Sequence, residues 1–317
     1  MKVYNSLGQP LDISDTPLLN GKGGEGVVYS IPALPKYCAK IYHPSKRTTE
    51  RLQKLEYMVK NAPKPLITNQ YIICWPTKVI FDAHKNFLGF VMPLAFPKSV
   101  LCYEICRMKI SSDLDTNWDR FYNRHTPMGI INRLKLIDNI AIPIHEIHSM
   151  GKYVLVDFKP QNMLITIDGK ISIIDLDSIQ INDNQTQFLC PVRTLEYLPP
   201  ELQYNTNINS ALSPSCDRFA LAVIFYQILY GLHPFTVTAK DERICELREL
   251  IAKGLFPFGR YSHKISVIPA PHNKYQILPM EIQSLFRHAF DANPNIRPSA
   301  EQWGATIYNF ISKLPPQ

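Results

Sequence analysis

The sequence lacks the features that direct a chain to a membrane, to the secretory pathway or onto nucleic acid. It begins without the apolar core of a signal peptide, and its most apolar stretch, residues 219–230, is too short to cross a bilayer. Its seven cysteines include no CxxC pair, so we expect reduced thiols and neither a disulfide framework nor a zinc site. Basic residues are scattered, so nucleic acid is not an expected partner despite the net charge of +7. These absences predict a cytoplasmic protein with no membrane span.

Internal repeats and low-complexity tracts are also missing, and the 317 residues suit two packed lobes. Hydrophobic residues make up 45% of the chain, enough for a sizeable core. Strands are expected at residues 27–31, 37–42, 72–75, 79–81 and 87–92, and helices at 46–60, 130–149 and 217–230. The predicted fold class is therefore α+β. Lobe 1–93 would hold an antiparallel sheet and one helix, and lobe 94–317 would be mainly helical.

A glycine-rich segment, Gly21 to Val28, matches the pattern GxGxxGxV through Gly21, Gly23 and Gly26. Glycines allow the backbone to approach phosphates closely and to adopt positive φ. The segment leads into Val27 and Val28 and not into a helix, which argues against a dinucleotide-binding fold. It is not followed by the Gly-Lys-Ser/Thr of a Walker loop. The pattern predicts a strand–loop–strand lid over ATP, although a glycine-rich turn without function would look the same.

A lysine follows this loop in the segment Tyr-Cys-Ala-Lys-Ile-Tyr, and its position predicts a role in neutralising the α- and β-phosphates. This residue, Lys40, needs an anion to hold it in place. The next helix offers Glu50 and Glu56, and we expect Glu56 because it lies between apolar neighbours. The alternative for both glutamates is an exposed helix charge.

Four polar residues in the second lobe supply what phosphoryl transfer from ATP requires. Asp157 can orient the attacking hydroxyl and accept its proton, and Lys159 can offset charge on the γ-phosphoryl group. Asn162 and Asp175 offer the oxygen ligands that Mg²⁺ prefers. A hairpin over residues 163–174, with its turn at 168–169, is expected to bring Asp175 back beside Asp157. An isolated Asp or Asn in a turn is more often only a turn former, so the prediction depends on all four together.

These motifs jointly resemble the protein kinase superfamily, and the resemblance covers nearly the whole chain. GKGGEGVV is similar to the glycine-rich loop, DFKPQN to the catalytic loop and IIDLDS to the metal-binding DFG segment. The resemblance implies a bilobal kinase fold that uses ATP with Mg²⁺ or Mn²⁺ to phosphorylate Ser or Thr in a protein substrate. It also implies that Met92 is the gatekeeper residue and that Pro93, Leu94 and Ala95 form the hinge that meets adenine.

The resemblance extends to the platform for a peptide substrate. LPPEL, with Glu201, is similar to the APE motif, and Arg297 is similar to the arginine that pairs with its glutamate. Asp217 resembles the start of the long buried helix of the larger lobe. Thr194 is expected to contact Asp157 and Lys159, as in the serine/threonine-specific members. The likeness of IDLDS to bacterial kinases found beside phosphatases implies a cognate phosphatase as a partner.

The sequence departs from the family pattern at three places. The usual His-Arg before the catalytic aspartate is Leu155-Val156, so we expect activity that does not depend on phosphorylation of the activation loop. The glycine of DFG is Asp177, which either tunes a cation or caps a turn. The glutamate partner of Lys40 is not evident.

Two alternatives to a protein kinase stay open, a nucleotide-binding pseudokinase scaffold and a kinase that acts on a small molecule. Lys40, Asp157 and Asp175 favour catalysis over a scaffold, because inactive relatives usually lack one of the three. Residues 111–124 form a polar run that matches no motif and is either a loop or an insert for a partner.

Overall fold

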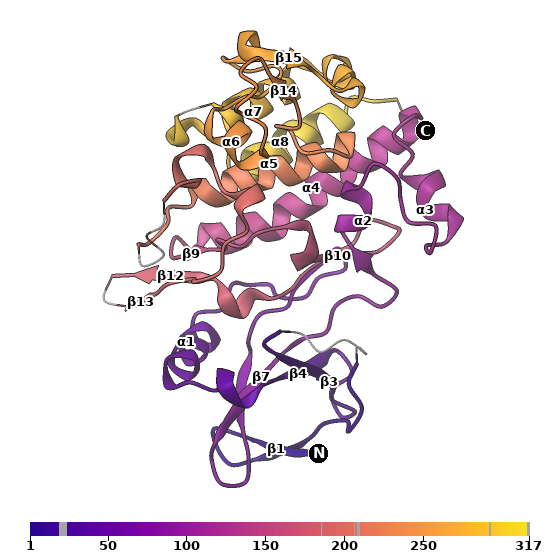
Figure 1. The fold of residues 1–317 in the computed structure, drawn as a ribbon. Coiled ribbons are helices and arrows are strands. Elements are labelled where there is room, and N and C mark those ends of the chain that lie inside the picture. Colours follow the sequence, from indigo (N-terminus) through magenta and orange to yellow (C-terminus); the bar gives the residue numbers. More distant parts are fainter. Residues whose placement is uncertain (19–23, 185, 206, 208–209, 292, 316–317) are drawn as a thin grey trace. The chain divides into compact units, whose positions relative to one another are not determined.

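The computed structural model describes residues 1–18, 24–184, 186–205, 207, 210–291 and 293–315 (Figure 1). The contacts within the chain define two compact units. The N-terminal unit comprises Met1–Pro97 with Ser172–Asp177, and the C-terminal unit comprises Lys98–Ile171 with Ser178–Gln317. The short segment Ser172–Asp177 thus joins the N-terminal unit from a distant part of the sequence. The expected lobe boundary, between residues 93 and 94, stays a prediction.

The N-terminal unit is built on a six-stranded antiparallel sheet in the order β2-β1-β6-β7-β4-β3. Its elements are β1 (Lys2–Asn5), β2 (Pro10–Asp12), β3 (Gly26–Ser30), β4 (Tyr37–Tyr42), α1 (Thr49–Lys60), β5 (Tyr71–Ile73), β6 (Lys78–Phe81) and β7 (Phe87–Pro93). The strands and the helix expected from the sequence are all found, and the antiparallel sheet is confirmed. Strands β1 and β2 were not expected, because each is too short to show a clear alternation.

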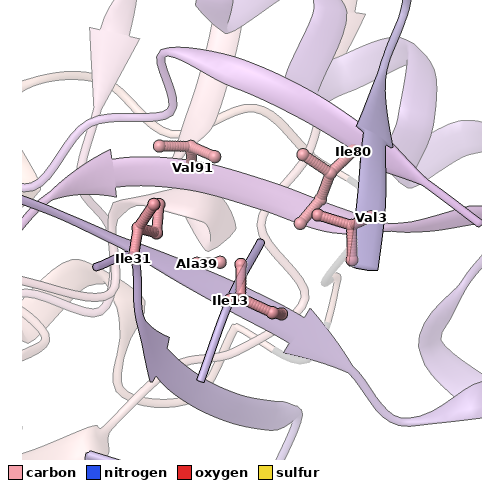
Figure 2. Packing of buried hydrophobic residues seen from close by; sticks show 6 residues of the cluster. All are labelled: Val3, Ile13, Ile31, Ala39, Ile80 and Val91. Carbon is pink, nitrogen blue, oxygen red and sulfur yellow. The ribbon is translucent and has the colours of Figure 1, made fainter. Parts of the chain in front are cut away.

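One face of this sheet packs a hydrophobic cluster and the other carries Lys40. Ala39 lies opposite Val91 in the β4–β7 register and belongs to a buried cluster with Val3, Ile13, Ile31 and Ile80 (Figure 2). Successive side chains of a strand point to opposite faces. Lys40, directly after Ala39, therefore points to the face away from this cluster.

Helix α1 has a clear beginning and a clear buried side. The Thr48 hydroxyl accepts a hydrogen bond from the Arg51 backbone N–H, which caps the first turn. Leu55 and Met58 are fully buried, and the indole of Trp75 donates to the Met58 carbonyl at 2.9 Å. The helix contacts β6 and β7. Apolar packing and a cap thus fix α1 to the sheet.

The C-terminal unit is mainly helical, as expected. Its elements are β8 (Val100–Leu101), α2 (Tyr103–Cys106), α3 (Thr116–Phe121), α4 (Pro127–Ser149), β9 (Tyr153–Val154), β10 (Met163–Ile165), β12 (Gln180–Asp183), β13 (Thr186–Phe188), α5 (Ser215–Tyr230), β14 (Thr238–Ala239), α6 (Leu247–Ala252), β15 (Ile265–Val267), α7 (Met280–Phe290) and α8 (Ala300–Ile311). Strand β11 (Ile171–Ile173) spans the boundary between the units. In the part of the chain that the structure describes, no helix combines the length and the apolar character needed to cross a membrane.

Helix α5 is the centre of this unit and is buried on all sides, as its continuous apolar sequence predicts. It contacts α2, α4 and α7, and α4 packs along α8 (Figure 1). The ring of Phe225 meets the indole of Trp303 edge-on, with centroids 5.3 Å apart. The helix is capped by Gly231, which adopts a φ of 78° and donates its N–H in a hydrogen bond to the Gln227 carbonyl.

The polar run 111–124 is part of the packed unit. It contains helix α3, and the side chains of Trp118 and Tyr122 are buried. Arg133 of α4 donates to the carbonyls of Tyr122, at 2.7 Å, and of Ile105, at 2.9 Å. Burial lowers the pKa of Arg133 well below its usual range. The run is therefore not a plain loop, because buried aromatic side chains and a hydrogen bond from Arg133 hold it in place. An insert for a partner stays a prediction.

A buried histidine connects the end of α5 to the segment that precedes α5. The Nε2 atom of His233 donates to the Glu196 carbonyl at 2.9 Å, and Nδ1 accepts from the Phe235 N–H at 3.3 Å. Both contacts require the neutral ring, because a second proton on Nδ1 would break the bond from Phe235. Burial lowers the pKa of His233 to about 4.

This histidine predicts a loss of stability in acid. The unfolded chain binds a proton at His233 near pH 6.5 and the folded chain only near pH 4, so lowering the pH through this window favours unfolding by up to about 3 kcal/mol. We expect His233→Gln to flatten the pH dependence of the unfolding free energy between pH 6.5 and 4, measured by urea titration. His272, whose pKa burial also lowers, would add a smaller slope of the same sign. A slope as steep as that of the wild type would show that another group is responsible.

Candidate active site

The loop between β9 and β10 carries a carboxylate that a cation and a hydroxyl hold in place. Lys159 Nζ donates to Asp157 Oδ2 at 2.6 Å, and the Thr194 hydroxyl donates to Asp157 Oδ1 at 2.5 Å. Lys159 Nζ also donates to the Thr194 hydroxyl at 3.1 Å, which closes a triangle. The expected contact of Thr194 with Asp157 and Lys159 is thus confirmed. Short bonds to an ionised group are strong, so the carboxylate has a defined orientation.

Asn162 is fixed to the same loop. Its Nδ2 donates to the Asp157 carbonyl at 2.8 Å, and its backbone N–H donates to the Lys159 carbonyl at 2.9 Å. The turn Pro160–Asn162 is a single 3₁₀ turn, and Pro160 at its start sets φ for that turn. With its amide NH₂ engaged by the loop, Asn162 has its side-chain oxygen left for a ligand.

The backbone before Asp157 is strained, and a buried carboxylate holds it. Val156 has φ of 65°, a conformation that a β-branched residue adopts at a cost of about 1–3 kcal/mol. Asp217, at the start of α5, accepts the N–H groups of Leu155 at 2.7 Å and Val156 at 2.9 Å. It also accepts a bond from His148 Nε2 at 2.9 Å. These bonds to an ionised group offset the strain.

The phosphate lysine expected from the sequence lies in β4 of the N-terminal unit, beside two aspartates. Lys40 Nζ is 2.8 Å from Asp177 Oδ1, 3.1 Å from Asp177 Oδ2 and 3.3 Å from Asp175 Oδ1. Burial alone would lower the pKa of Lys40, but the charges of Asp177 and Asp175 outweigh it and the pKa is raised. Burial would raise the pKa of Asp177, but the Lys40 charge and the hydrogen bonds hold it below its usual range. Both partners are therefore charged near neutral pH.

Further side chains extend this ion pair towards α1 and the glycine-rich segment. The Tyr42 hydroxyl donates to Asp177 Oδ2 at 2.6 Å. The Arg51 guanidinium lies 4.5 Å from the centroid of the Tyr42 ring and binds both carboxylate oxygens of Glu25, at 2.8 and 3.0 Å. Glu25 directly precedes β3. One polar network thus connects β4, α1, the beginning of β3 and the segment that contains Asp175.

The expected partner of Lys40 requires a correction. Glu56 and the alternative Glu50 both have exposed side chains on α1. The ion pairs that the described residues form with Lys40 use Asp177 and Asp175 instead. Asp177 stands where the family pattern has glycine, and that departure was the signal in the sequence. What the sequence did not indicate was that its carboxylate would turn towards Lys40.

The glycine-rich segment is only partly within the described residues, because Gly21 and Gly23 lie outside them. Gly26 begins β3, and a Cβ atom there would lie 2.4 Å from the Ile41 carbonyl oxygen. Val28 pairs with Lys40 across β3 and β4, so the two side chains share one face of the sheet. The strand after the glycines therefore lies beside the lysine, as expected for a lid and its lysine.

The hinge expected at Met92–Ala95 continues directly from β7. Met92 pairs with Cys38 across β4 and β7, two positions before Lys40, so it lies on the same face of the sheet as Lys40. Leu94 donates its N–H to the Lys36 carbonyl at 2.9 Å, and Pro93 has no N–H to donate. The segment is thus anchored at Leu94, with Ala95 as the next amide.

The predicted pair of Glu201 and Arg297 is present. Arg297 donates through both terminal nitrogens to the two Glu201 oxygens, at 2.7 and 2.8 Å, and its own side chain is fully buried. It also donates to the Ser215 hydroxyl at 2.9 Å. This bidentate pair ties the segment after Thr194 to the beginning of α5.

Comparison with known proteins gives several matches. A family model described as the protein kinase domain matches residues 92–308. The chain is similar to Protein kinase YegI of Escherichia coli strain K12, at 27% identity, over 99% of this chain and 47% of YegI. It is also similar to human Serine/threonine-protein kinase MRCK gamma, at 31% identity over 44% of this chain and 9% of that protein. The chain spans about half the length of YegI.

A solved structure described as the ROP18 kinase domain in complex with AMP-PNP and sucrose matches with a TM-score of 0.63. The match covers 98% of this chain and 83% of that one, at 15% sequence identity, and shows the fold. The antiparallel sheet with one helix and the mainly helical unit agree with it, so the predicted bilobal kinase fold is confirmed. The family model covers more than half of the residues. The chain therefore belongs to the protein kinase family.

Proposed function

We propose that this chain is an ATP-dependent protein kinase that phosphorylates Ser or Thr hydroxyls. The observation that carries the proposal is the triangle of Asp157, Lys159 and Thr194 on one loop of a chain in the kinase family. A turn former without function needs no buried carboxylate held by both a lysine and a threonine.

Asp157 is the base in this proposal. A side chain that accepts a proton must be within hydrogen-bond distance of the attacking hydroxyl, and its geometry must be fixed in advance. Lys159 and Thr194 fix the Asp157 carboxylate, and Lys159 also supplies positive charge where the γ-phosphoryl group carries negative charge in transfer. Their chemistry matches a reaction in which positioning and charge do most of the work.

Lys40 and the hinge bind the nucleotide. The raised pKa of Lys40 keeps it charged, as a group that contacts the α- and β-phosphates must be. We assign the backbone of the Gly21–Gly26 segment to the phosphates, with Val28 beside the lysine. We assign the amide of Ala95 to the adenine edge, because Leu94 donates to Lys36 and Pro93 has no N–H.

Asn162 and Asp175 would hold the metal ion. Their side chains offer an amide oxygen and a carboxylate, which are the hard oxygen donors that Mg²⁺ and Mn²⁺ prefer. Asn162 uses its NH₂ group on the Asp157 carbonyl, and the Asp175 side chain is 58% exposed. A bound ion would neutralise phosphate charge. In this proposal each residue would supply one ligand, and Asn162 also holds the loop of Asp157 through its bond to the Asp157 carbonyl.

Two features support Ser or Thr in a protein as the acceptor. Thr194 contacts Asp157 directly, as expected of serine/threonine-specific members of the family. The buried Arg297 fixes Glu201 and with it the segment on which a peptide would lie. A cognate phosphatase remains the partner implied by the likeness to bacterial kinases.

Asp157→Asn should remove phosphoryl transfer with little change in fold. Asparagine keeps the shape of aspartate but cannot accept the proton, so we expect activity to fall by about 10²–10⁴-fold. The measurement is phosphopeptide mapping by mass spectrometry after incubation with ATP, Mg²⁺ or Mn²⁺ and a generic protein.

Asp183→Asn is the matched control, because Asp183 is also an aspartate in an ion pair, with Lys152 Nζ at 3.1 Å, and has no role in the proposed mechanism. If neither the wild type nor Asp157→Asn labels protein, yet both gain thermal stability with ATP, the chain is a nucleotide-binding scaffold. Labelling of small molecules alone would identify a small-molecule kinase.

Activity should not require phosphorylation of the activation segment. Val156, where the family pattern has arginine, is buried and apolar, so it offers no charge to a phosphate on that segment. We expect prior treatment with a broad-specificity protein phosphatase, and the variants Thr186→Ala and Thr186→Glu, to leave the rate within about twofold of the wild type. A tenfold loss after phosphatase treatment, restored by Thr186→Glu, would refute this expectation.

A further inference from the structure

We propose that Asp177 is the residue that positions Lys40 for the nucleotide, in place of a glutamate from helix α1. In the kinase family the phosphate lysine is held by a glutamate of the helix that follows it in sequence. This inference deepens the proposed function and rests on the role given there to Lys40.

The contact geometry singles out Asp177. Both of its carboxylate oxygens lie within 3.1 Å of Lys40 Nζ, whereas Asp175 reaches it with one oxygen at 3.3 Å. The Asp177 side chain is 2% exposed and that of Asp175 is 58% exposed. Asp177 is therefore the fixed anchor. Asp175 keeps an accessible carboxylate, as a metal ligand requires.

A second bond fixes the orientation of the Asp177 carboxylate itself. Tyr42 lies on β4 two residues after Lys40, on the same face of the strand, and its hydroxyl donates to Asp177 Oδ2 at 2.6 Å. The tyrosine ring is buried, so the hydroxyl has little freedom to move. Asp177 is thus held by two neighbours on one strand, and it holds the lysine in turn.

Helix α1 does not supply the anion in this arrangement. Its buried positions are Lys54, Leu55 and Met58, and its glutamates, Glu50 and Glu56, are exposed. Arg51 of α1, a cation, reaches the network, where it stacks on Tyr42 and binds Glu25. The helix therefore brings positive charge to the site where the family pattern brings negative charge.

The position of Asp177 two residues after Asp175 has a mechanical consequence. The lysine that binds phosphate and the carboxylate that would bind metal are set by one short segment, 175–177. A rotation of α1 could separate a lysine from a helix glutamate, whereas the Asp177 carboxylate that binds Lys40 does not belong to that helix. The phosphate-binding lysine is assembled without a contribution of negative charge from α1.

A double-mutant cycle tests the proposal, with the affinity for a fluorescent, non-hydrolysable ATP analogue as the first measurement. We expect Asp177→Asn to raise the dissociation constant at least tenfold and to raise KM for ATP more than it lowers kcat. In a Lys40→Met background, Asp177→Asn should cause no further loss of binding, because Asp177 acts through Lys40. The double variant should also unfold at a higher temperature than Lys40→Met, because it no longer buries an unpaired carboxylate.

Tyr42→Phe and Asp183→Asn complete the set. Tyr42→Phe keeps the charges and removes one hydrogen bond to Asp177, so we expect the dissociation constant of the analogue to rise only about two- to fivefold. If Asp177→Asn does not fold, Tyr42→Phe takes its place in the test. Asp183→Asn should bind as the wild type does. Three results would each overturn the proposal. Asp177→Asn could leave the affinity for the analogue unchanged, or lower it equally in the wild type and in the Lys40→Met background. Glu56→Gln could also lower the affinity as much as Asp177→Asn does.

The binding measurement separates this inference from the proposed function. A wild type that binds the analogue and follows the cycle, but phosphorylates no protein, would refute kinase activity and leave the role of Asp177 standing. If the wild type phosphorylates protein but Asp177→Asn changes neither the binding of the analogue nor KM for ATP, the proposed function stands and the role of Asp177 is refuted. A wild type that binds no analogue would overturn both.

Discussion

The buried carboxylate of Asp217 is the constraint on which the loop of Asp157 depends. It stands at the first turn of α5, the most deeply buried helix, and accepts two backbone N–H groups from Leu155 and Val156. Those bonds stabilise a backbone conformation at Val156 that its side chain disfavours. Asp157 follows directly in the chain, so the contacts of Asp217 with this backbone also set the orientation of Asp157. The loop is therefore held by bonds to a buried helix.

Lys40, the proposed phosphate-binding residue, is held by a buried ion pair and not by backbone hydrogen bonds. Lys40 and Asp177 are both charged and almost completely buried. Such a pair adds little net stability, but the loss of either partner would leave an uncompensated charge in the interior. The network from Glu25 through Arg51 and Tyr42 surrounds the pair with further bonds. The value of the arrangement is therefore orientation of the ammonium group more than stability of the fold.

Much of this could be predicted from the sequence where the signal was local. Helix α5 is recognisable from a continuous apolar run, and the order of Lys40, Asp157, Asn162 and Asp175 indicates the chemistry. The partner of Lys40 was not predictable, because an exposed and a buried carboxylate look alike in a sequence. Asp177 could be noticed as a departure, but the direction of its side chain depends on Tyr42, 135 positions away. Strands β1 and β2 were missed because three or four residues show no periodicity.

The spacing of the sheet around β4 has a consequence for how this protein can vary. Gly26 faces the Ile41 carbonyl on one side of the strand, and Gly89 faces the Lys40 carbonyl on the other, where a Cβ atom would come within 1.9 Å. A methyl group at either position would wedge the neighbouring strand away and displace the ammonium group along with it. The absence of side chains at Gly26 and Gly89 therefore keeps the strand that carries Lys40 in its position. A substitution at Gly89 would in this way shift Lys40 although it replaces no residue of the proposed nucleotide site.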